Sequence, residues 1–353
     1  MTETDNIVAE TAERIFADLA DAQTINSSKN GAWKAPLWTA LSDSGLPLSW
    51  VSEDYDGSGA SIAEGFSVIA AAGRAALAVP LAETMLAGWL LEQAGIASPA
   101  EIMTVAPTAP RDVITLNPDG TLSGSARGVP FARDAKHIAV LATSSTGASI
   151  ALIDTSLCQI TNGLNLANDP SDTVIFKNVV PAAIKPAPTG FTLASLLLMG
   201  AAMRSLQIAG ALETLLNISV QYANERVAFE KKISKFQAVQ HNLAKLAGEA
   251  AAALAAATSA ADAIANHAGA DELFLEAASA KIRSSEAAEK GAAIAHQVHG
   301  AIGFTDEHIL HRFTLRALAW RDDFGSESYW AVELGKLVAK RGADELWPLV
   351  ASR

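Results

Sequence analysis

Two stretches in the C-terminal half contain residues whose types and spacing could bind a nucleotide. In QVHGAIG, which begins at Gln297, the glycines Gly300 and Gly303 interrupt a helical pattern. A backbone exposed by glycines can approach a phosphate or a ring closely. In RVAFEKKISKFQ, the planar fork of Arg226 could bind two phosphate oxygens at once. A plain turn at a helix end explains the glycines equally well, so neither stretch is decisive alone.

Four histidines beside the glycine turn could instead bind a metal ion. They form two pairs with a spacing of three residues, His296 with His299 and His308 with His311. That spacing places both members of a pair on one helix face, and two such pairs could bind zinc. No cysteine lies nearby, and the only close carboxylates follow Thr305 directly. Because histidines near turns are more often ordinary hydrogen-bonding residues, we expect no metal site.

The composition limits the classes of partner. The chain has 353 residues, 50% of them apolar, which is enough to bury a sizeable core. Its formal charge of -12 and pI near 5.0 argue against nucleic acid as a partner. The acidic start MTETDNIVAE lacks the features of a secretory signal, and runs such as Leu196–Met203 fall short of the roughly 20 apolar residues that span a bilayer. Cys158 is the single cysteine and cannot form an internal disulfide, so we expect a soluble, cytoplasmic protein without a membrane partner.

Hydrophobic periodicity divides the chain into three parts that must position these residues. Residues 1–103 show helical spacing with short breaks. Residues 104–185 contain short β-type runs, among them DVITL, HIAVLA and TVIFKNV, which predict a small antiparallel barrel or sandwich. Residues 186–353 return to long helical patterns, notably over 192–225 and 237–268, which predict a helical bundle.

The sequence resembles the acyl-CoA dehydrogenase family in the order of these parts. The resemblance is most specific where RVAFEKKISKFQAVQHNLAKLA, residues 226–247, is followed by QVHGAIG, and PLAET at residues 80–84 adds support. It implies an α+β fold with an N-terminal helical domain, a small middle β-barrel or sandwich and a C-terminal four-helix bundle.

The middle part departs from the family's pattern. Flavin-binding members usually carry there a Thr-Glu-Pro loop with Gly-Ser-Asp, and later a Trp-Ile-Thr-Asn segment. This chain reads VAPTAPRDVITL and SARGVPFARDAKHIAVLA instead. Arg127, Val129 and Ala132 lie roughly where the second motif would be, but the family's flavin contacts do not transfer to them.

The two C-terminal motifs do transfer, residue by residue. In the family, the first contacts FAD across a subunit interface, with the arginine at the pyrophosphate and aromatic packing on the adenine side. The second motif holds the dinucleotide of the neighbouring subunit, and Ala301 replaces its usual second glycine here. An interface packed without a nucleotide is the alternative. The resemblance therefore implies these cofactor-binding residues: Arg226, Phe229, Phe236, Gln237, Gln297, Gly300, Ala301 and Gly303.

The implied reaction is the FAD-dependent oxidation of an acyl-CoA thioester to its 2,3-enoyl form. A carboxylate removes the α-proton while hydride leaves the β-carbon for the flavin. No GxGxxG follows a strand, which agrees with FAD in place of NAD. An electron-transfer flavoprotein is the implied electron acceptor.

The sequence departs most from the family's pattern at the catalytic carboxylate. An ungapped count from the glycine turn places Phe324 at the family's commonest base, and the second known location falls near Gly200 and Ala201. None of these residues can accept the proton. A shift of one residue brings Asp323 to the position, and we predict it as the base; an exposed loop acid or a helix cap is its alternative.

Three interpretations of function remain. The chain is a homo-oligomeric acyl-CoA dehydrogenase, for which Asp323→Asn would abolish turnover and leave FAD binding unchanged. Alternatively, it is the divergent subunit of a hetero-oligomer whose sister chain supplies the missing flavin contacts or the base. The third interpretation is a non-enzymatic helical interaction protein that retains the fold.

Overall fold

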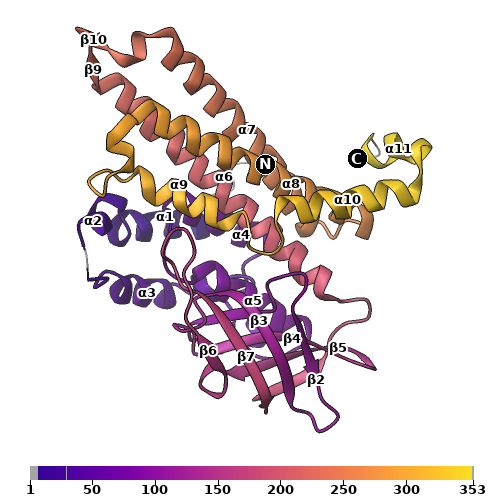
Figure 1. The fold of residues 1–353 in the computed structure, drawn as a ribbon. Coiled ribbons are helices and arrows are strands. Elements are labelled where there is room, and N and C mark those ends of the chain that lie inside the picture. The colour runs from indigo at the N-terminus through magenta and orange to yellow at the C-terminus, as the bar shows by residue number, and fades with distance from the viewer. Residues whose placement is uncertain (1–6, 29, 352–353) are drawn as a thin grey trace.

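The computed structural model describes residues 7–28 and 30–351, so the first six residues of the acidic start lie outside the described part. Figure 1 shows N-terminal helices in indigo, a sheet in magenta and long helices from pink to yellow. The helix, sheet, helix order predicted from periodicity is therefore confirmed.

The N-terminal part consists of short helices packed on one another. α4 begins at a capping box, in which the side chains of Ser61 and Glu64 each bond the other residue's backbone N–H. α5 is buried over most of its length, and even Glu83 in its first turn is inaccessible. The elements are α1 (Ile7–Leu19), α2 (Ala22–Ser27), α3 (Lys34–Asp43), η1 (Leu46–Leu48), η2 (Glu53–Tyr55), α4 (Ile62–Arg74) and α5 (Leu81–Gln93).

The middle part is one sheet with the order β6-β7-β3-β2-β4-β5-β8, and β1 pairs with β4. Most pairs are antiparallel, as predicted, but β4 pairs in parallel with both β1 and β2. β1 pairs with the first half of β4, and β2 pairs with its end. Both strands run in the same direction as β4. The strands are β1 (Met103–Ala106), β2 (Val113–Leu116), β3 (Leu122–Pro130), β4 (His137–Ser144), β5 (Gly147–Asp154), β6 (Gln159–Thr161), β7 (Ser171–Val179) and β8 (Ala183–Pro186), with η3 (Thr155–Leu157) between β5 and β6.

The C-terminal part is built on long helices that coincide with the predicted patterns. A small hairpin lies between the helices of residues 193–225 and 237–265, and a 3-10 turn follows the helix of residues 270–299. The elements are α6 (Leu193–Glu225), β9 (Val227–Ala228), β10 (Lys231–Lys232), η4 (Ile233–Lys235), α7 (Gln237–Ala265), α8 (Ala270–His299), η5 (Gly300–Phe304), α9 (Leu310–Trp320), α10 (Glu327–Arg341), η6 (Ala343–Glu345) and α11 (Leu346–Ala351).

α6 is the central helix and runs from beside the sheet to the far end of the bundle (Figure 1). Two glycines bring it close to α4: a Cβ atom at Gly73 would lie 2.3 Å from the carbonyl of Gln207, and one at Gly210 would lie 2.4 Å from that of Ala70. By length and composition α6 could cross a bilayer, but 83% of its most apolar window is buried by the protein, as in the core helix of a soluble protein.

Candidate functional site

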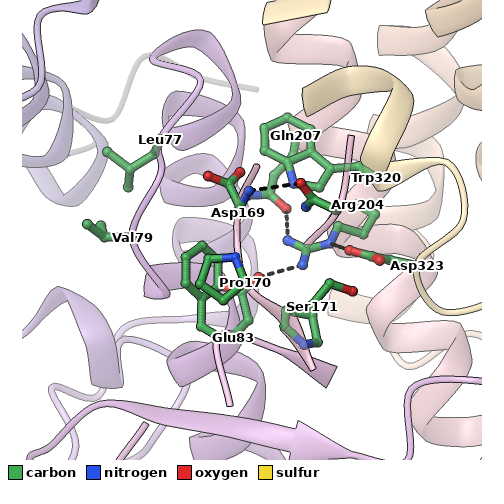
Figure 2. Close-up of a pocket in the computed structure, with 13 residues that line it drawn as sticks. Leu77, Val79, Glu83, Asp169, Pro170, Ser171, Arg204, Gln207, Trp320 and Asp323 are labelled. Carbon is green, nitrogen blue, oxygen red and sulfur yellow. Dashed lines mark hydrogen bonds and ion pairs between the residues drawn. The ribbon is translucent and has the colours of Figure 1, made fainter. Parts of the chain in front are cut away.

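The first half of α6 carries a buried arginine that contacts three side chains. Arg204 Nη2 donates to Oε1 of Glu83 at 2.5 Å, Nε donates to Oδ2 of Asp323 at 2.9 Å, and Nη1 donates to Oε1 of Gln207 at 2.5 Å. Only 2% of Arg204 is exposed. Figure 2 shows the guanidinium surrounded by these three residues, which with Arg204 we call the Arg204 cluster.

The loop that carries Asp323 is fixed from two sides. Lys281 of α8 is fully buried, and its Nζ donates to the carbonyl of Trp320, the last residue of α9, at 2.5 Å. On the other side, Nε1 of Trp330 in α10 donates to the carbonyl of Phe324 at 3.1 Å. The loop between α9 and α10 therefore has little freedom to move Asp323 away from Arg204.

The electrostatics of the cluster follow from burial and from its paired charges. Burial raises the pKa of Glu83, and Arg204 offsets only part of that shift. Burial opposes the charge of Arg204, but Glu83 and Asp323 outweigh it and raise the pKa of the guanidinium. Arg204 is therefore a cation whose charge is met by carboxyl groups from two distant elements.

Little space remains around the cluster. The pocket enclosed by Glu83, Phe131, Arg204, Trp320 and Asp323 has a volume of about 10 Å³ open to the centre of a water molecule, which is room for about one water. On the same measure, the neighbouring open cleft between the sheet and the end of α9, which Asp323 also lines, has about 410 Å³. Neither an acyl chain nor a flavin ring fits beside Arg204 in this arrangement.

Both sequence positions counted for a catalytic carboxylate lie next to the cluster. Phe324 is buried, and a Cβ atom added to Gly200 would lie 2.3 Å from its ring. The guanidinium of Arg204, one turn after Gly200 on α6, is 5.8 Å from the centroid of the Phe324 ring. The two positions expected for a catalytic carboxylate are therefore adjacent in the structure, where the Phe324 ring packs against Gly200.

The predicted base, Asp323, lies at this point but is engaged in an ion pair. Its side chain is 18% exposed, and one carboxylate oxygen accepts from Arg204. Asp323 also lines the open cleft, as Asp322 does, whereas Glu327 pairs with Arg321 at 3.2 Å. A general base must offer a lone pair to the substrate proton. The assignment of Asp323 stays a prediction, in competition with its contact to Arg204.

The predicted nucleotide residues of the first motif lie away from the cluster, at the far tip of the bundle. Arg226 follows the end of α6, is exposed and forms no ion pair within the described part of the chain. Phe229 is 89% exposed at the hairpin and meets the ring of Phe236 edge-on at 6.3 Å. Lys231 Nζ lies 4.3 Å from the centroid of the Phe236 ring. Gln237 is exposed and begins α7.

The second motif exposes its backbone at one glycine only. Gly300 has a φ of +65°, and a Cβ atom there would meet nothing within 4 Å. Gln297 and Ala301 are also exposed. Gly303 is buried, and a Cβ atom there would lie 2.9 Å from Leu310, so close packing accounts for this glycine. We call residues 226–237 and 297–303 the nucleotide segments.

The exposed side chains of the nucleotide segments fit the phosphate and adenine end of FAD. They offer an arginine free to bind phosphate, an accessible aromatic ring and an open backbone at a glycine. None of them lines the pocket at Arg204. They can therefore serve a nucleotide only on the outside of this chain.

Among the four histidines, the His299 and His308 rings meet with their centroids 4.8 Å apart. Among residues 7–28 and 30–351, no group of three or more His, Cys, Asp or Glu side chains is arranged to hold a metal ion. His296 Nε2 and Thr314 Oγ1 are 3.0 Å apart, and His311 Nδ1 lies 2.7 Å from the carbonyl of His308. Hydrogen bonding accounts for these two ring nitrogens, whereas Nδ1 of His296 and Nε2 of His299 are buried without a partner in the described part of the chain.

Sequence reasoning missed Arg204 and Glu83. A signal existed for each, because Arg204 is the one charge in LASLLLMGAAMRSLQIAGAL and Glu83 interrupts the apolar run of PLAETMLAGWLL. A lone charge in a helix that is otherwise buried requires a partner. The sequence could not identify that partner, because Glu83 and Arg204 are 121 residues apart.

Comparisons with known proteins agree with the architecture. Residues 189–327 match the family model described as acyl-CoA dehydrogenase, C-terminal domain. The chain is 28% identical over 289 residues, 80% of each chain, to acyl-CoA dehydrogenase IpdE2 of Mycobacterium tuberculosis, and 26% identical to IpdE2 of Mycolicibacterium smegmatis over 90% of this chain and 93% of that protein. A chain of the ChsE4-ChsE5 complex from Mycobacterium tuberculosis shares the fold with a TM-score of 0.87 and 23% identity, over 97% of this chain and 99% of that one.

Proposed function

Because the chain is a divergent member of the acyl-CoA dehydrogenase family, we propose that it takes part in the FAD-dependent oxidation of an acyl-CoA thioester as one chain of a hetero-oligomer. Its own substrate pocket is closed, and its nucleotide segments serve the site of a related sister chain. The observation that carries this proposal is the Arg204 cluster, which fills the space beside Phe324 and Gly200.

The closed pocket supports this function over a self-sufficient enzyme. A base must reach the α-carbon of the substrate, so the acyl group must lie beside the position of the base. In this chain that position is Phe324, and the adjacent volume is occupied by paired side chains. Opening the pocket would separate buried charges, which costs several kcal/mol.

The nucleotide segments give the chain a role in the oligomer. When bound, the flavin of FAD accepts the hydride that leaves the β-carbon. Arg226 would bind the pyrophosphate, Phe229 and Phe236 would pack against the adenine, and the backbone at Gly300 would allow close approach. The sister chain would provide the base. The electrons would pass to an electron-transfer flavoprotein, as expected from the resemblance. The ChsE4-ChsE5 complex, one chain of which has the same fold, is named for two proteins.

Co-expression tests this function. The chain is produced alone and together with each acyl-CoA dehydrogenase chain encoded next to its gene. We expect the chain alone to lack the visible absorption of bound FAD and to oxidise no acyl-CoA with an artificial electron acceptor. With its sister chain, we expect a complex that contains both chains in equal number by light scattering, binds FAD and turns over. A chain that forms a yellow, active homo-oligomer alone would overturn the proposal.

A further inference from the structure

The contact between Tyr222 and His299 joins the two nucleotide segments. We propose that these two residues position the segments relative to each other for dinucleotide binding, and that this positioning requires an uncharged His299. The inference rests on the proposed function, because it assigns the segments to FAD.

A continuous series of contacts links Arg226 to Gly300 through these two residues. The backbone N–H of Arg226 donates to the carbonyl of Tyr222 at 2.8 Å, where α6 ends. The Tyr222 ring stacks on the His299 ring, with centroids 4.4 Å apart and an interplanar angle of 25°. The Tyr222 hydroxyl donates to the carbonyl of His299 at 3.3 Å, directly before Gly300. A displacement at either residue therefore moves one segment relative to the other.

The surroundings of His299 accept only a neutral ring. His299 is 4% exposed, and its Nδ1 lies 2.8 Å from the carbonyl of Ala295, so Nδ1 carries the proton and donates it there. Its Nε2 is buried and has no hydrogen-bond partner within the described part of the chain. A second proton would place an N–H and a positive charge where no acceptor exists, and such a buried donor is costly.

The titratable neighbours of His299 also oppose a positive charge. They are Tyr222 from α6, His296 from its own helix, and His308, whose ring centroid is 4.8 Å away, from the loop before α9. No carboxylate of residues 7–28 and 30–351 pairs with the ring. Burial lowers the pKa of His299, and His308 and His296 lower it further, against the opposing effect of the Ala295 carbonyl.

The link between the nucleotide segments depends on pH through the protonation of His299. In the unfolded chain the imidazole pKa is about 6.5, and in the folded chain it is lower. The stability that a neutral His299 contributes is fully present above the unfolded value and is lost as the pH falls through the folded one. Mild acid therefore weakens the link between the segments, whereas neutral and basic pH leave it intact.

Two variants and a control separate this role from a purely structural one. His299→Asn retains a donor for the Ala295 carbonyl but cannot be protonated, and Tyr222→Phe retains the stacked ring but loses the hydroxyl. His267→Asn is the matched control, because His267 is exposed at the end of α7. Each is measured in the full complex with its sister chain, with FAD as the probe, at pH 7.5 and pH 5.5.

We expect the FAD affinity of the wild type and of the control to fall by up to roughly tenfold between pH 7.5 and pH 5.5, the limit for a group that titrates below 6.5 in the folded chain. His299→Asn should show equal affinity at both pH values, and Tyr222→Phe should bind FAD more weakly at both. An acid-induced fall in His299→Asn that equals that of the wild type would overturn the inference.

Histidine NMR of the full chain gives a second readout that needs neither FAD nor turnover. The His299 ring should titrate below 6.5, and the backbone signals of residues 300–304 should change with the same midpoint. A His299 ring that titrates at or above 6.5 contradicts the inference. If no complex binds FAD, the proposed function fails, and the NMR titration still decides whether His299 controls the turn.

Discussion

The Arg204 cluster and the nucleotide segments differ in how they satisfy their polar groups. In the cluster, an arginine with 2% exposure is bonded to three side chains of the same chain. In the nucleotide segments, Arg226 is exposed and forms no ion pair within the described residues, and Phe229 is 89% exposed. The first region is complete within one chain. The second offers binding groups that this chain does not use.

This difference assigns the Arg204 cluster to the stability of the fold and the nucleotide segments to binding. Buried charges whose partners lie in the same chain hold α5, α6 and the loop after α9 together, and removing one of them leaves the others unpaired. Exposed charges contribute little to stability, so Arg226 can be changed without cost to the fold. The division agrees with the proposed function, in which the Arg204 cluster is structural and the nucleotide segments bind FAD.

The largest expected effect is the loss of Arg204. Arg204→Leu leaves the carboxyl groups of Glu83 and Asp323 in a closed pocket without their cation. We expect the free energy of unfolding to fall by about 3–5 kcal/mol, measured by urea denaturation. The control is Arg74→Leu, which removes partly exposed pairs with Glu13 and Glu213 and should cost less than about 1 kcal/mol. Equal losses in the two variants would contradict the difference between the regions.

Lys281 next to the cluster gives the next largest effect, through pH. Burial lowers its pKa from 10.5 to about 7, with Asp323 acting against that shift. As the pH falls from about 10 to 7, the unfolded chain gains the lysine proton before the folded chain does, so wild-type stability falls. Lys281→Met removes this contribution of lysine protonation to the free energy of unfolding. We expect its stability relative to the wild type to improve by about 2–3 kcal/mol between pH 9 and pH 7 in urea titrations. A pH-independent difference would show that the amine is not desolvated.

The fold was accessible from the sequence because its signals are local. Periods of 3.6 and 2 residues identified α6, α7 and five of the strands, but not β3, β6 or β8, and the glycine turn at Gly300 marked the end of α8. The parallel pairing of β4 was not accessible, because it depends on where β1 and β2 meet the same strand.

The site was only partly accessible for the same reason. The ungapped alignment with the family's two base positions identified Phe324 and Gly200, and the structure places these two residues in contact. The count could not show that Arg204 fills the space beside them, because its carboxylate partners are more than a hundred residues away. Local patterns identify elements and motifs, whereas a closed pocket arises from contacts among distant elements.

Arg226 tests the recognition side of the comparison with a smaller effect. In the complex with its sister chain, Arg226→Ala should reduce FAD affinity by about tenfold or more, as expected for the loss of charge-assisted hydrogen bonds. Helicity by circular dichroism should not change, because Arg226 lies beyond the end of α6. Lys340→Ala, an exposed charge near the end of α10, is the control and should bind FAD normally. Full FAD content in Arg226→Ala would remove this residue from the nucleotide site.

Asp323 gives the smallest expected effect on turnover and decides between the two enzymatic interpretations. If Asp323 is the base, Asp323→Asn abolishes acyl-CoA oxidation. If the pocket is closed and the sister chain carries the base, the same change leaves turnover of the complex unaltered and instead lowers stability, because Arg204 loses a charged partner. We expect the second outcome, since Arg204 holds one carboxylate oxygen of Asp323 and the pocket at Arg204 has room for about one water. Turnover by stopped-flow and unfolding in urea are measured on the same preparation. A variant that is fully stable but inactive would restore Asp323 as the base and require the Arg204 cluster to open during catalysis.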